Sequence, residues 1–309
     1  MSGRLLIVGL ATSLDRYAWL PQLRLGAINR PREVLVRAGG KGLNAARAAS
    51  GLGVRVRSVS LAGGETGQLV RALAPPLDVR FVDSGAETRQ CLCLLGDDAV
   101  LTEVYEPVLP VSSTIWPSVL SAVADEIEEC DLVALSGRVP PGLPVDALAE
   151  IVDLAVARRV PVVVDSDGPS LIEAIRRGPT LVKVNAAEAA AAAPGDLSQL
   201  QKLGAKSVVV TTGPTGARFL GADGSRLTVS HDAIPNALPV GSGDAFLAGL
   251  TAVWLGGSSG PPFGGLSEPA EALRVAAAAA RANARRLPAG DISWDQVKAE
   301  LSAVRISAI

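Results

Sequence analysis

The stretch VPVVVDSDGPSLIEAIRRGPTLVKVN, Val160–Asn185, decides the fold class of this chain. Its two ends, VPVVV and LVKV, are short apolar runs with the length and valine content of strands that are buried on both faces. The segment GPSLIEAIRRG between them is predicted to be a helix. A strand, a helix and a second strand in this order form a βαβ unit, in which the two strands are parallel.

The same alternation continues in both directions along the chain. Helices are predicted in STIWPSVLSAVADEIEECD and in PVDALAEIVDLAVARRV, where apolar residues recur at helical spacing. Further buried strands are predicted at Arg4–Leu10, Val56–Gly63, Leu132–Gly137 and Ser207–Gly213. The sequence therefore predicts an α/β fold with a doubly wound, mostly parallel sheet and helices on both of its faces.

Two segments interrupt this alternation. REVLVRAGG (Arg32–Gly40) and RQCLCLLGDDAVLTEVYEP (Arg89–Pro107) have the partly alternating pattern of two-sided strands, and the second contains a GDD turn. We expect residues near 12–38 and 88–110 to form a small second sheet, either a lid or a dimer contact, on a single domain that spans residues 1–309. The Gly-, Ser- and Pro-rich stretch Gly256–Pro269 is predicted to be a flexible loop.

Composition narrows the class of protein. The 309 residues carry a net charge of −2 without a Lys/Arg cluster, so nucleic acid is not an expected partner. The apolar run Leu5–Leu10 is too short for a signal peptide or a membrane span, which favours a cytoplasmic protein. Cys91, Cys93 and Cys130, with the single histidine His231, do not form a zinc pattern, and buried reduced thiols are expected.

The first glycine-rich site is AGGKGLNAARAASGLG, Ala38–Gly53. Gly39 and Gly40 allow a ligand to approach the backbone before a helix that points its positive end at the turn, and Asn44 lies in the first helical turn. The residue after Lys41 is glycine rather than Ser or Thr, so the segment is not a Walker A loop. A binding loop and a plain glycine turn that leads into a helix are equally compatible with this pattern.

The second site is PVGSGDAFLAGL, where a helix is predicted to begin near Asp244. Gly241, Ser242 and Gly243 would present backbone N–H groups as a nest for an anion, strengthened by the helix dipole. Asp244 could simply cap this helix, which is a common use of aspartate. An acid beside an anion nest could also accept the proton of a hydroxyl that attacks a phosphoryl group, and we expect Asp244 to do both.

Two further sites follow predicted strands. Lys183, Asn185 and Glu188 in LVKVNAAEA could serve phosphate and Mg²⁺, although the same residue types also cap helices. TTGPTGA (Thr211–Ala217) is expected to be a strand, a tight turn and a second strand, a turn that either lies under a nucleotide or only reverses the chain.

In this order, the four sites resemble the PfkB, or ribokinase-like, family of carbohydrate kinases. GGKGLNAARAASGLG resembles the first family signature and PVGSGDAFLAGL the second, and the resemblance extends from the N-terminus to about Asn283. It implies a ribokinase-like fold with a small β lid, ATP as co-substrate with Mg²⁺, and transfer of a phosphoryl group to a sugar hydroxyl.

The resemblance assigns a role to single residues. Asp244 matches the catalytic base, and Gly241, Ser242 and Gly243 match the anion hole. Asn185 and Glu188 match the residues that organise Mg²⁺ through water, with Val184 where the family often has proline. The nucleotide side is matched by Lys183, Asn185, Thr211, Gly213, Gly216 and Asn283. The sugar side is expected to include Asp15, Gly39, Gly40, Lys41, Asn44, Arg89 and Ser136, and Arg138 is a further candidate there that the resemblance does not assign.

Within the family, the chain is most similar to the branch that contains 1-phosphofructokinase and tagatose-6-phosphate kinase. GAINRPREVLVRAGGKGLN, ETRQCLCLLG, TEVYEPVLPVS and LSGRVPPGLP carry this similarity. A sugar phosphate needs cations at its distal end, which Arg89 and Lys41 are expected to supply; Arg138 is either a third such cation or a solvated surface residue. EPVLPVS lacks a Gly-Pro, and TRQCLC an asparagine, that this branch often has.

Two alternatives to a sugar-phosphate kinase stay open. One is a kinase of an unphosphorylated sugar or nucleoside, and the other is a non-catalytic sensor of sugar phosphates. A homodimer through the lid is also expected, because an exposed lid edge could pair with a second copy.

Overall fold

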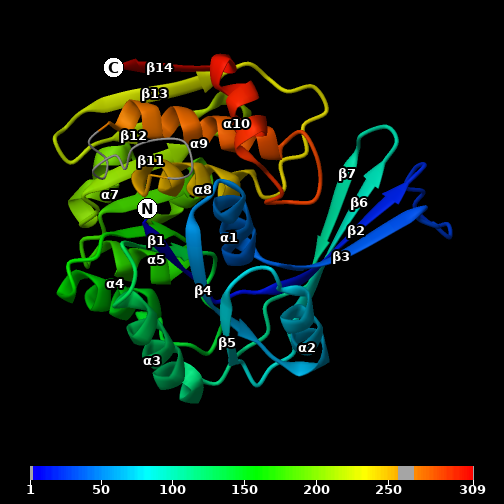
Figure 1. The fold of residues 1–309 in the computed structure, drawn as a ribbon, viewed down its shortest axis with the longest axis horizontal. Helices are drawn as coiled ribbons and strands as arrows, with labels where there is room; N and C mark the ends of the chain where they lie inside the picture. Colours follow the sequence, from blue (N-terminus) through cyan, green and yellow to red (C-terminus); the bar gives the residue numbers. More distant parts are fainter. Residues whose placement is uncertain (1–2, 257–267, 309) are drawn as a thin grey trace.

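The computed structural model describes residues 3–256 and 268–308, so most of the predicted loop Gly256–Pro269 lies outside the described residues. Figure 1 shows a wide body built on one large sheet, with a smaller sheet projecting from it. The predicted α/β class is confirmed. None of the helices in the described ranges combines the length and apolarity needed to cross a bilayer.

The large sheet has ten strands in the order β14-β13-β12-β11-β10-β9-β8-β1-β4-β5. Strands β11 to β5 along this order pair in parallel, and the three strands beyond β11 are antiparallel. The strands are β1 (Arg4–Gly9), β4 (Arg55–Ala62), β5 (Val79–Asp83), β8 (Leu132–Ser136), β9 (Val162–Asp165), β10 (Leu181–Asn185), β11 (Ser207–Thr211), β12 (Ala217–Leu220), β13 (Arg226–His231) and β14 (Val304–Ala308).

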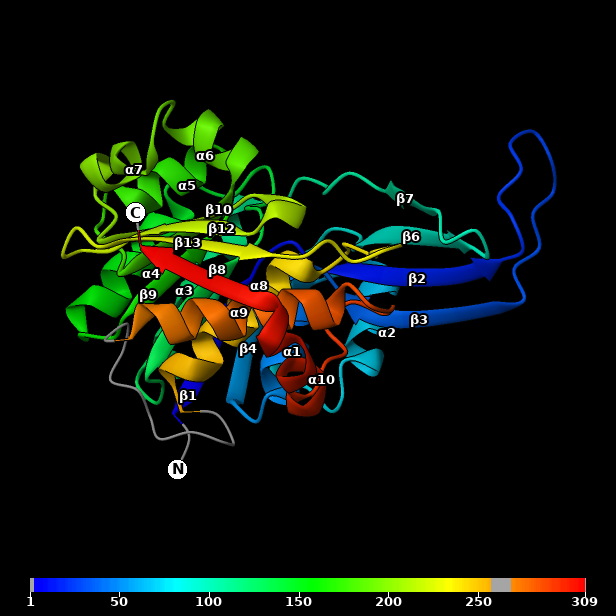
Figure 2. The same ribbon diagram turned by 90° about the horizontal axis from the view of Figure 1, so that it is seen from above.

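Helices cover both faces of this sheet, as expected for strands that are apolar on both sides. In β1, Leu5 and Ile7 join one core cluster while Leu6 and Val8 join the other. The first cluster involves α1 (Lys41–Gly51), α8 (Ser242–Trp254), α9 (Pro269–Asn283) and α10 (Trp294–Glu300). The second involves α3 (Trp116–Ile127), α4 (Ala147–Ala157), α5 (Gly168–Ile175), α6 (Ala186–Ala192) and α7 (Leu197–Leu203). Figure 2 shows α5, α6 and α7 on one side of β10, β12 and β13, and α8, α9 and α10 on the other.

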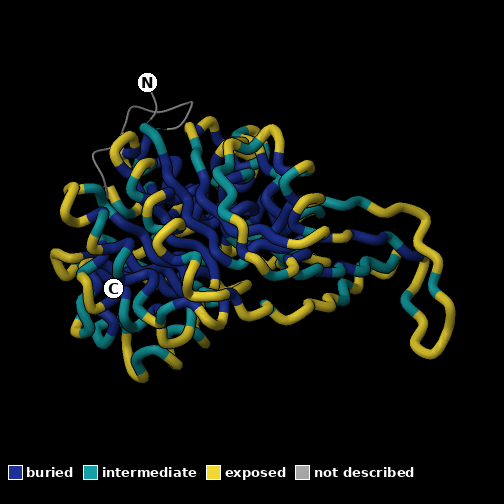
Figure 3. The backbone as a smooth tube through the Cα atoms, turned by 90° about the horizontal axis from the view of Figure 1, so that it is seen from below, coloured by how far each residue is buried: buried dark blue, intermediate teal, exposed yellow. Residues whose placement is uncertain are grey.

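The small sheet has the strand order β3-β2-β6-β7. It consists of β2 (Ser13–Leu20), β3 (Glu33–Gly39), β6 (Arg89–Gly96) and β7 (Leu101–Tyr105), within the two segments predicted for it, and α2 (Gly64–Leu73) packs beside its base. The strand β2 was not singled out from the sequence, because SLDRYAWL mixes charged and aromatic residues without clear alternation. Figure 3 shows that the connection between β2 and β3, at the far end of this sheet, is largely exposed.

Helix α8 is held deep in the body. All of its residues from Asp244 to Val253 are buried, and its neighbours are α1 and α9. A Cβ on Gly249 would lie 2.8 Å from the Cα of Ala276, so this glycine allows α8 and α9 to pack with their backbones close together. Packing against α1 and α9 therefore holds the N-terminus of α8 at the edge of the sheet where the parallel strands end.

Candidate functional site

Two cavities meet at the N-terminus of α8, outside the carboxyl ends of the parallel strands, where ligands bind in open α/β sheets. One, of about 420 Å³, reaches the small sheet and is lined by charged and polar groups; we call it the polar cavity. The other, of about 370 Å³, lies between β13, α8 and α9 and is mostly apolar; we call it the apolar cavity. They share the wall formed by Thr211, Gly213, Pro239, Ser242 and Gly243.

The start of α8 depends on a glycine. Gly241 is the N-cap residue and has φ 74°, in the left-handed region, and a Cβ there would lie 2.5 Å from the Cβ of Ala289. The first N–H groups of a helix have no partner inside the helix, so this end can bind an anion. The N–H of Ser242 is an exception, because it donates to the carbonyl of Pro239 at 3.0 Å. The available nest therefore consists of the N–H groups of Gly241, Gly243 and Asp244.

The expectation that Asp244 caps α8 is wrong. Gly241 is the N-cap, and Asp244 lies three residues further on, within the first turn. Its carboxylate instead accepts a hydrogen bond from Asn44 Nδ2 at 3.3 Å, across the interface with α1. Burial raises the pKa of the Asp244 carboxyl to about 6, against the charge of Lys41 and with the help of the negative charge of Asp165. A buried carboxylate with this pKa is able to accept a proton near neutral pH.

Asp165 is a member of the site that the sequence did not single out. It ends β9 and is fully buried, with Oδ2 at 2.5 Å from Lys183 Nζ and Oδ1 at 3.8 Å from Lys41 Nζ. Lys183 is itself buried and lies beside Gly243, where a Cβ would be 3.2 Å from Nζ. A signal for Asp165 was present, because VVVD ends at the same edge of the sheet as LVKVN.

Asn185 and Glu188 form a capping box on α6. Asn185 Oδ1 accepts from the Glu188 N–H at 2.9 Å, and Glu188 Oε2 accepts from the Asn185 N–H at 2.8 Å. The other oxygen, Glu188 Oε1, faces Lys41 Nζ at 3.4 Å and lines the polar cavity. The helix-capping role is thus present, and each side chain keeps capacity for a further ligand.

The small sheet supplies the opposite end of the polar cavity. Asp15, Arg89, Cys91, Cys93 and Tyr105 line it from three strands, with Asp15 directly opposite Cys91. Ser13 Oγ donates to Asp15 Oδ1 at 2.6 Å, and burial raises the pKa of Asp15 while this hydrogen bond, Arg47 and Arg89 oppose the rise.

The glycine turn between β3 and α1 lies against this end of the cavity. A Cβ on Gly39 would lie 2.0 Å from Asp15 Oδ2, so Asp15 in this position requires a glycine. Gly40 has φ 94°, and α1 begins at Lys41. Gly40, Lys41 and Asn44 all line the polar cavity.

Four of the predicted residues lie outside both cavity walls. Gly39 lies just behind the wall, against Asp15, and the other three are Arg138, Ser136 and Asn283. Arg138 is largely exposed and makes a forked ion pair with Asp167, with Nε–Oδ1 3.0 Å and Nη2–Oδ2 2.7 Å. Ser136 is buried at the end of β8, and its hydroxyl has no hydrogen-bond partner. Asn283 donates through Nδ2 to the carbonyl of Val240 at 2.7 Å, so it supports the loop before α8 instead of facing a ligand.

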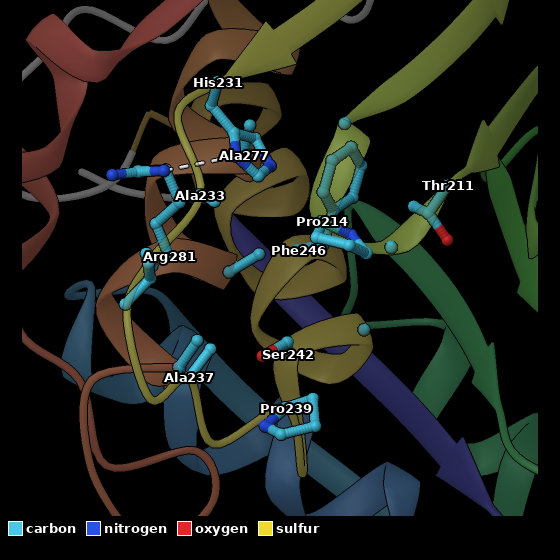
Figure 4. Close-up of a pocket in the computed structure, with 16 residues that line it drawn as sticks. Thr211, Pro214, His231, Ala233, Ala237, Pro239, Ser242, Phe246, Ala277 and Arg281 are labelled. Carbon is cyan, nitrogen blue, oxygen red and sulfur yellow. Dashed lines mark hydrogen bonds between the residues drawn. The ribbon is translucent and has the colours of Figure 1, made fainter.

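Of the residues that line the apolar cavity, the sequence singled out the turn residues Thr211, Gly213 and Gly216 and the anion-hole residues Ser242 and Gly243. Figure 4 shows His231, Phe246 and Arg281 around it, with Arg281 hydrogen-bonded to His231. Its α9 side is formed by Ala277, Ala280, Arg281 and Ala284, which recur at helical spacing in VAAAAARANA. Those alanines carried a signal, because small side chains on one helix face leave room for a flat ligand.

Comparison with known proteins identifies the class. Residues 3–295 match the family model described as "pfkB family carbohydrate kinase". The chain therefore belongs to the PfkB family and is an ATP-dependent carbohydrate kinase. Its fold resembles that of a Thermotoga maritima protein described as a possible 1-phosphofructokinase, with TM-score 0.87 and 21% identity over 99% of both chains.

Two further solved structures agree with the ribokinase-like fold. The tetrameric inhibited form of phosphofructokinase-2 from Escherichia coli has TM-score 0.82 and 24% identity over 97% of this chain and 98% of that one. A carbohydrate kinase from Agrobacterium tumefaciens has TM-score 0.73 and 24% identity over 99% of this chain and 100% of that one. The expected fold and enzyme class are confirmed.

Proposed function

We propose that this kinase transfers the γ-phosphoryl group of ATP to a hydroxyl of a sugar phosphate, in the manner of 1-phosphofructokinase or tagatose-6-phosphate kinase. Residues 1–309 would form one kinase domain, with the small sheet as its lid. The observation that carries the proposal is the position of Asp244, a buried carboxylate in the first turn of α8 that lines the polar cavity next to the wall shared with the apolar cavity.

The two cavities suggest how the substrates are arranged. A flat, apolar purine fits the apolar cavity, whose walls include Phe246, Pro214 and the alanines of α9. The phosphates would then lie across the shared wall, where Thr211 and Gly243 belong to both cavities. The acceptor would lie beneath the small sheet, with its hydroxyls on Asp15 and Asn44 and the attacking hydroxyl beside Asp244.

In this arrangement the residues of the chain perform each step. Asp244 accepts the proton of the attacking hydroxyl, which makes the oxygen a better nucleophile. The N–H groups of Gly241, Gly243 and Asp244, with the ammonium group of Lys41, bind the transferred phosphoryl group where its charge is largest. Most of the rate enhancement would come from positioning and electrostatics, as is general for phosphoryl transfer.

A Mg²⁺ ion is part of the proposal, and the donor set fits one that is held mainly by water and phosphate oxygens. The described residues contain no group of three or more His, Cys, Asp or Glu side chains arranged to hold a metal. Glu188 borders the polar cavity, and Asp165 Oδ1 is buried without a hydrogen-bond partner among the described residues, so two carboxylates lie near where the phosphates would pass. Mg²⁺ typically keeps several waters and binds one or two carboxylates together with substrate phosphates, and it would neutralise phosphate charge here.

The distal phosphate of the acceptor is assigned to Arg89. Of the three cations expected to meet it, Arg138 is paired with Asp167 outside the cavity, and Lys41 lies beside Glu188 at the transfer end. Arg89 begins β6 and lines the polar cavity, and its Nε is buried without a hydrogen-bond partner in the described part of the chain. An unpaired guanidinium donor is suited to a phosphate oxygen.

Arg89→Ala should raise the KM for a sugar phosphate by about 10- to 100-fold, the range for one lost hydrogen bond to a charged group. The KM for ATP should stay near the wild-type value, because Arg89 does not line the apolar cavity. Arg138→Ala is the matched control and should leave both constants unchanged. An Arg89→Ala enzyme with an unchanged acceptor KM would favour an unphosphorylated sugar or nucleoside as the acceptor.

A homodimer through the lid is also proposed. The face of the small sheet that points away from the polar cavity carries Val34 and Val104, which are 46% and 55% exposed. Apolar residues exposed on one face of a projecting sheet favour a second copy as the covering partner. The resemblance to a phosphofructokinase-2 described as tetrameric supports self-association.

Val104→Glu should shift the protein from dimer to monomer in sedimentation velocity at micromolar concentration. Two like charges would face each other across the proposed interface, which disfavours association. Val156→Glu on α4 is the control, since Val156 is 48% exposed far from the small sheet. A dimer that survives Val104→Glu, or one that Val156→Glu disrupts, would contradict the lid as the interface.

A further inference from the structure

Asn44 is held between two charged groups of opposite sign. Its Nδ2 donates to Asp244 Oδ2 at 3.3 Å, and its Oδ1 accepts from Arg47 Nη1 at 3.3 Å. A guanidinium only donates and an ionised carboxylate only accepts, so a single orientation of the amide satisfies both neighbours. The contact with Arg47 therefore reinforces the orientation in which the Nδ2 of Asn44 faces Asp244.

Arg47 is itself fixed by the glycine turn. Its Nη2 donates to the carbonyl of Ala38 at 2.7 Å, immediately before Gly39 and Gly40. Asn44 and Arg47 are three residues apart on α1 and hence share a face of the helix. One guanidinium thus spans the turn and the amide with two different nitrogens, a geometry that lysine cannot reproduce.

Arg47 also acts on the sugar side of the cavity. Burial and the charge of Arg37 lower the pKa of Arg47 to about 10, so it stays a cation at neutral pH. Its charge opposes the rise in the pKa of Asp15 that burial causes. An ionised Asp15 is the form that accepts hydrogen bonds from acceptor hydroxyls.

We propose that Arg47 is a positioning residue for phosphoryl transfer, which holds the Asn44 amide in the orientation that donates to Asp244. It touches neither substrate in this arrangement, since it does not line either cavity. The inference rests on the proposed function, because it takes Asp244 as the base. The inference adds a second role for the motif Ala38–Gly53: besides binding the acceptor, the motif orients a group that contacts the base.

The pH dependence of kcat/KM gives a readout that a purely structural role would not change. Asp244 works as a base only when ionised, so kcat/KM should fall as the pH drops through about 6 in the wild-type enzyme. The charged groups that face Asp244 are Lys41 from α1, Asp165 from β9 and Lys183 from β10. The hydrogen bond from Asn44 favours the ionised form, and Arg47 is not among the charges that act on Asp244 directly.

Arg47→Met should lower kcat/KM by about 10-fold, the effect of weakening one hydrogen bond to a charged group. It should also move the acid limb to higher pH, because an amide without a fixed orientation stabilises ionised Asp244 less. Arg47→Lys should show the same shift with a smaller change in the acceptor KM, since it keeps the charge near Asp15. Arg71→Met is the control: Arg71 is also a helix arginine that donates to a backbone carbonyl, that of Ala62 at 2.8 Å.

The double variant Asn44→Ala/Arg47→Met tests whether Arg47 affects Asp244 through Asn44. If Arg47 acts through Asn44, the double variant has the acid limb of Asn44→Ala alone. A folded Arg47→Met or Arg47→Lys enzyme with a wild-type acid limb would overturn the inference, as would a further shift in the Asn44→Ala background. Wild-type turnover by Asp244→Asn would refute the proposed base instead, so the two failures are distinguishable.

Discussion

Asp244→Asn is expected to lower kcat by about 10²–10⁴-fold, the usual contribution of a general base. Asparagine has nearly the same shape as aspartate and can still accept a hydrogen bond from Asn44, so the packing around α8 is retained. The amide, however, cannot take up the proton of the attacking hydroxyl. The KM for ATP should change little, because Asp244 borders the polar cavity and not the apolar one.

The stability of this variant provides a second check. The pKa of Asp244 is raised in the folded state, so its ionised form destabilises the fold above about pH 6. The variant removes that charge, and its Tm at pH 8 should equal or exceed that of the wild type. Asp167→Asn, which alters a carboxylate paired with Arg138 outside the cavity, should keep full activity. Near-wild-type turnover by Asp244→Asn would exclude Asp244 as the base.

Gly241→Ala is expected to lower kcat by about 10²–10³-fold, the range for loss of an oxyanion-hole donor. The new methyl group would lie 2.5 Å from the Cβ of Ala289, so the turn would have to move and take the N–H of Gly241 with it. Asn283, which binds the carbonyl of Val240 and the N–H of Gly290, would resist this movement. We therefore expect a loss of both activity and stability.

Gly85→Ala is the control for the backbone strain that Gly241→Ala introduces. Gly85 has φ 65°, close to the 74° of Gly241, but a Cβ there would meet no atom within 4 Å. Gly85→Ala should destabilise the fold by about 1–2 kcal/mol through the left-handed conformation and leave kcat unchanged. If Gly85→Ala and Gly241→Ala had the same kcat, the turn before α8 would not be the site of phosphoryl transfer.

Most of the strands and the four sequence motifs could be predicted because these features are local. Apolar runs ending in small or polar residues define strand ends, and parallel strands bring those ends to one edge of a sheet. In the structure Lys183, Asn185, Thr211 and the start of α8 meet at this edge and line the polar cavity. From the sequence, each motif could be interpreted separately, and only the resemblance to a family grouped them and added Asp15.

The features that were missed depend on contacts between distant segments. The capping role of Asp244 was a reasonable local expectation, but the N-cap is Gly241, and Asp244 bonds to Asn44, 200 residues away in sequence. Asn283 was placed in the nucleotide pocket, whereas packing turns its amide onto Val240. The apolar cavity needed β13, α8 and α9 together, and no single segment contains its pattern.

The most direct test of the central claim is Mg·ATP-dependent ADP release across a panel of acceptors, with Asp244→Asn as the control. The panel would contain fructose 1-phosphate, fructose 6-phosphate, tagatose 6-phosphate, ribose, fructose and adenosine. The account predicts that one sugar phosphate exceeds the neutral acceptors in kcat/KM and that this activity is lost in Asp244→Asn. A neutral acceptor with the highest kcat/KM, or no acceptor-dependent ADP release from the folded protein, would contradict it.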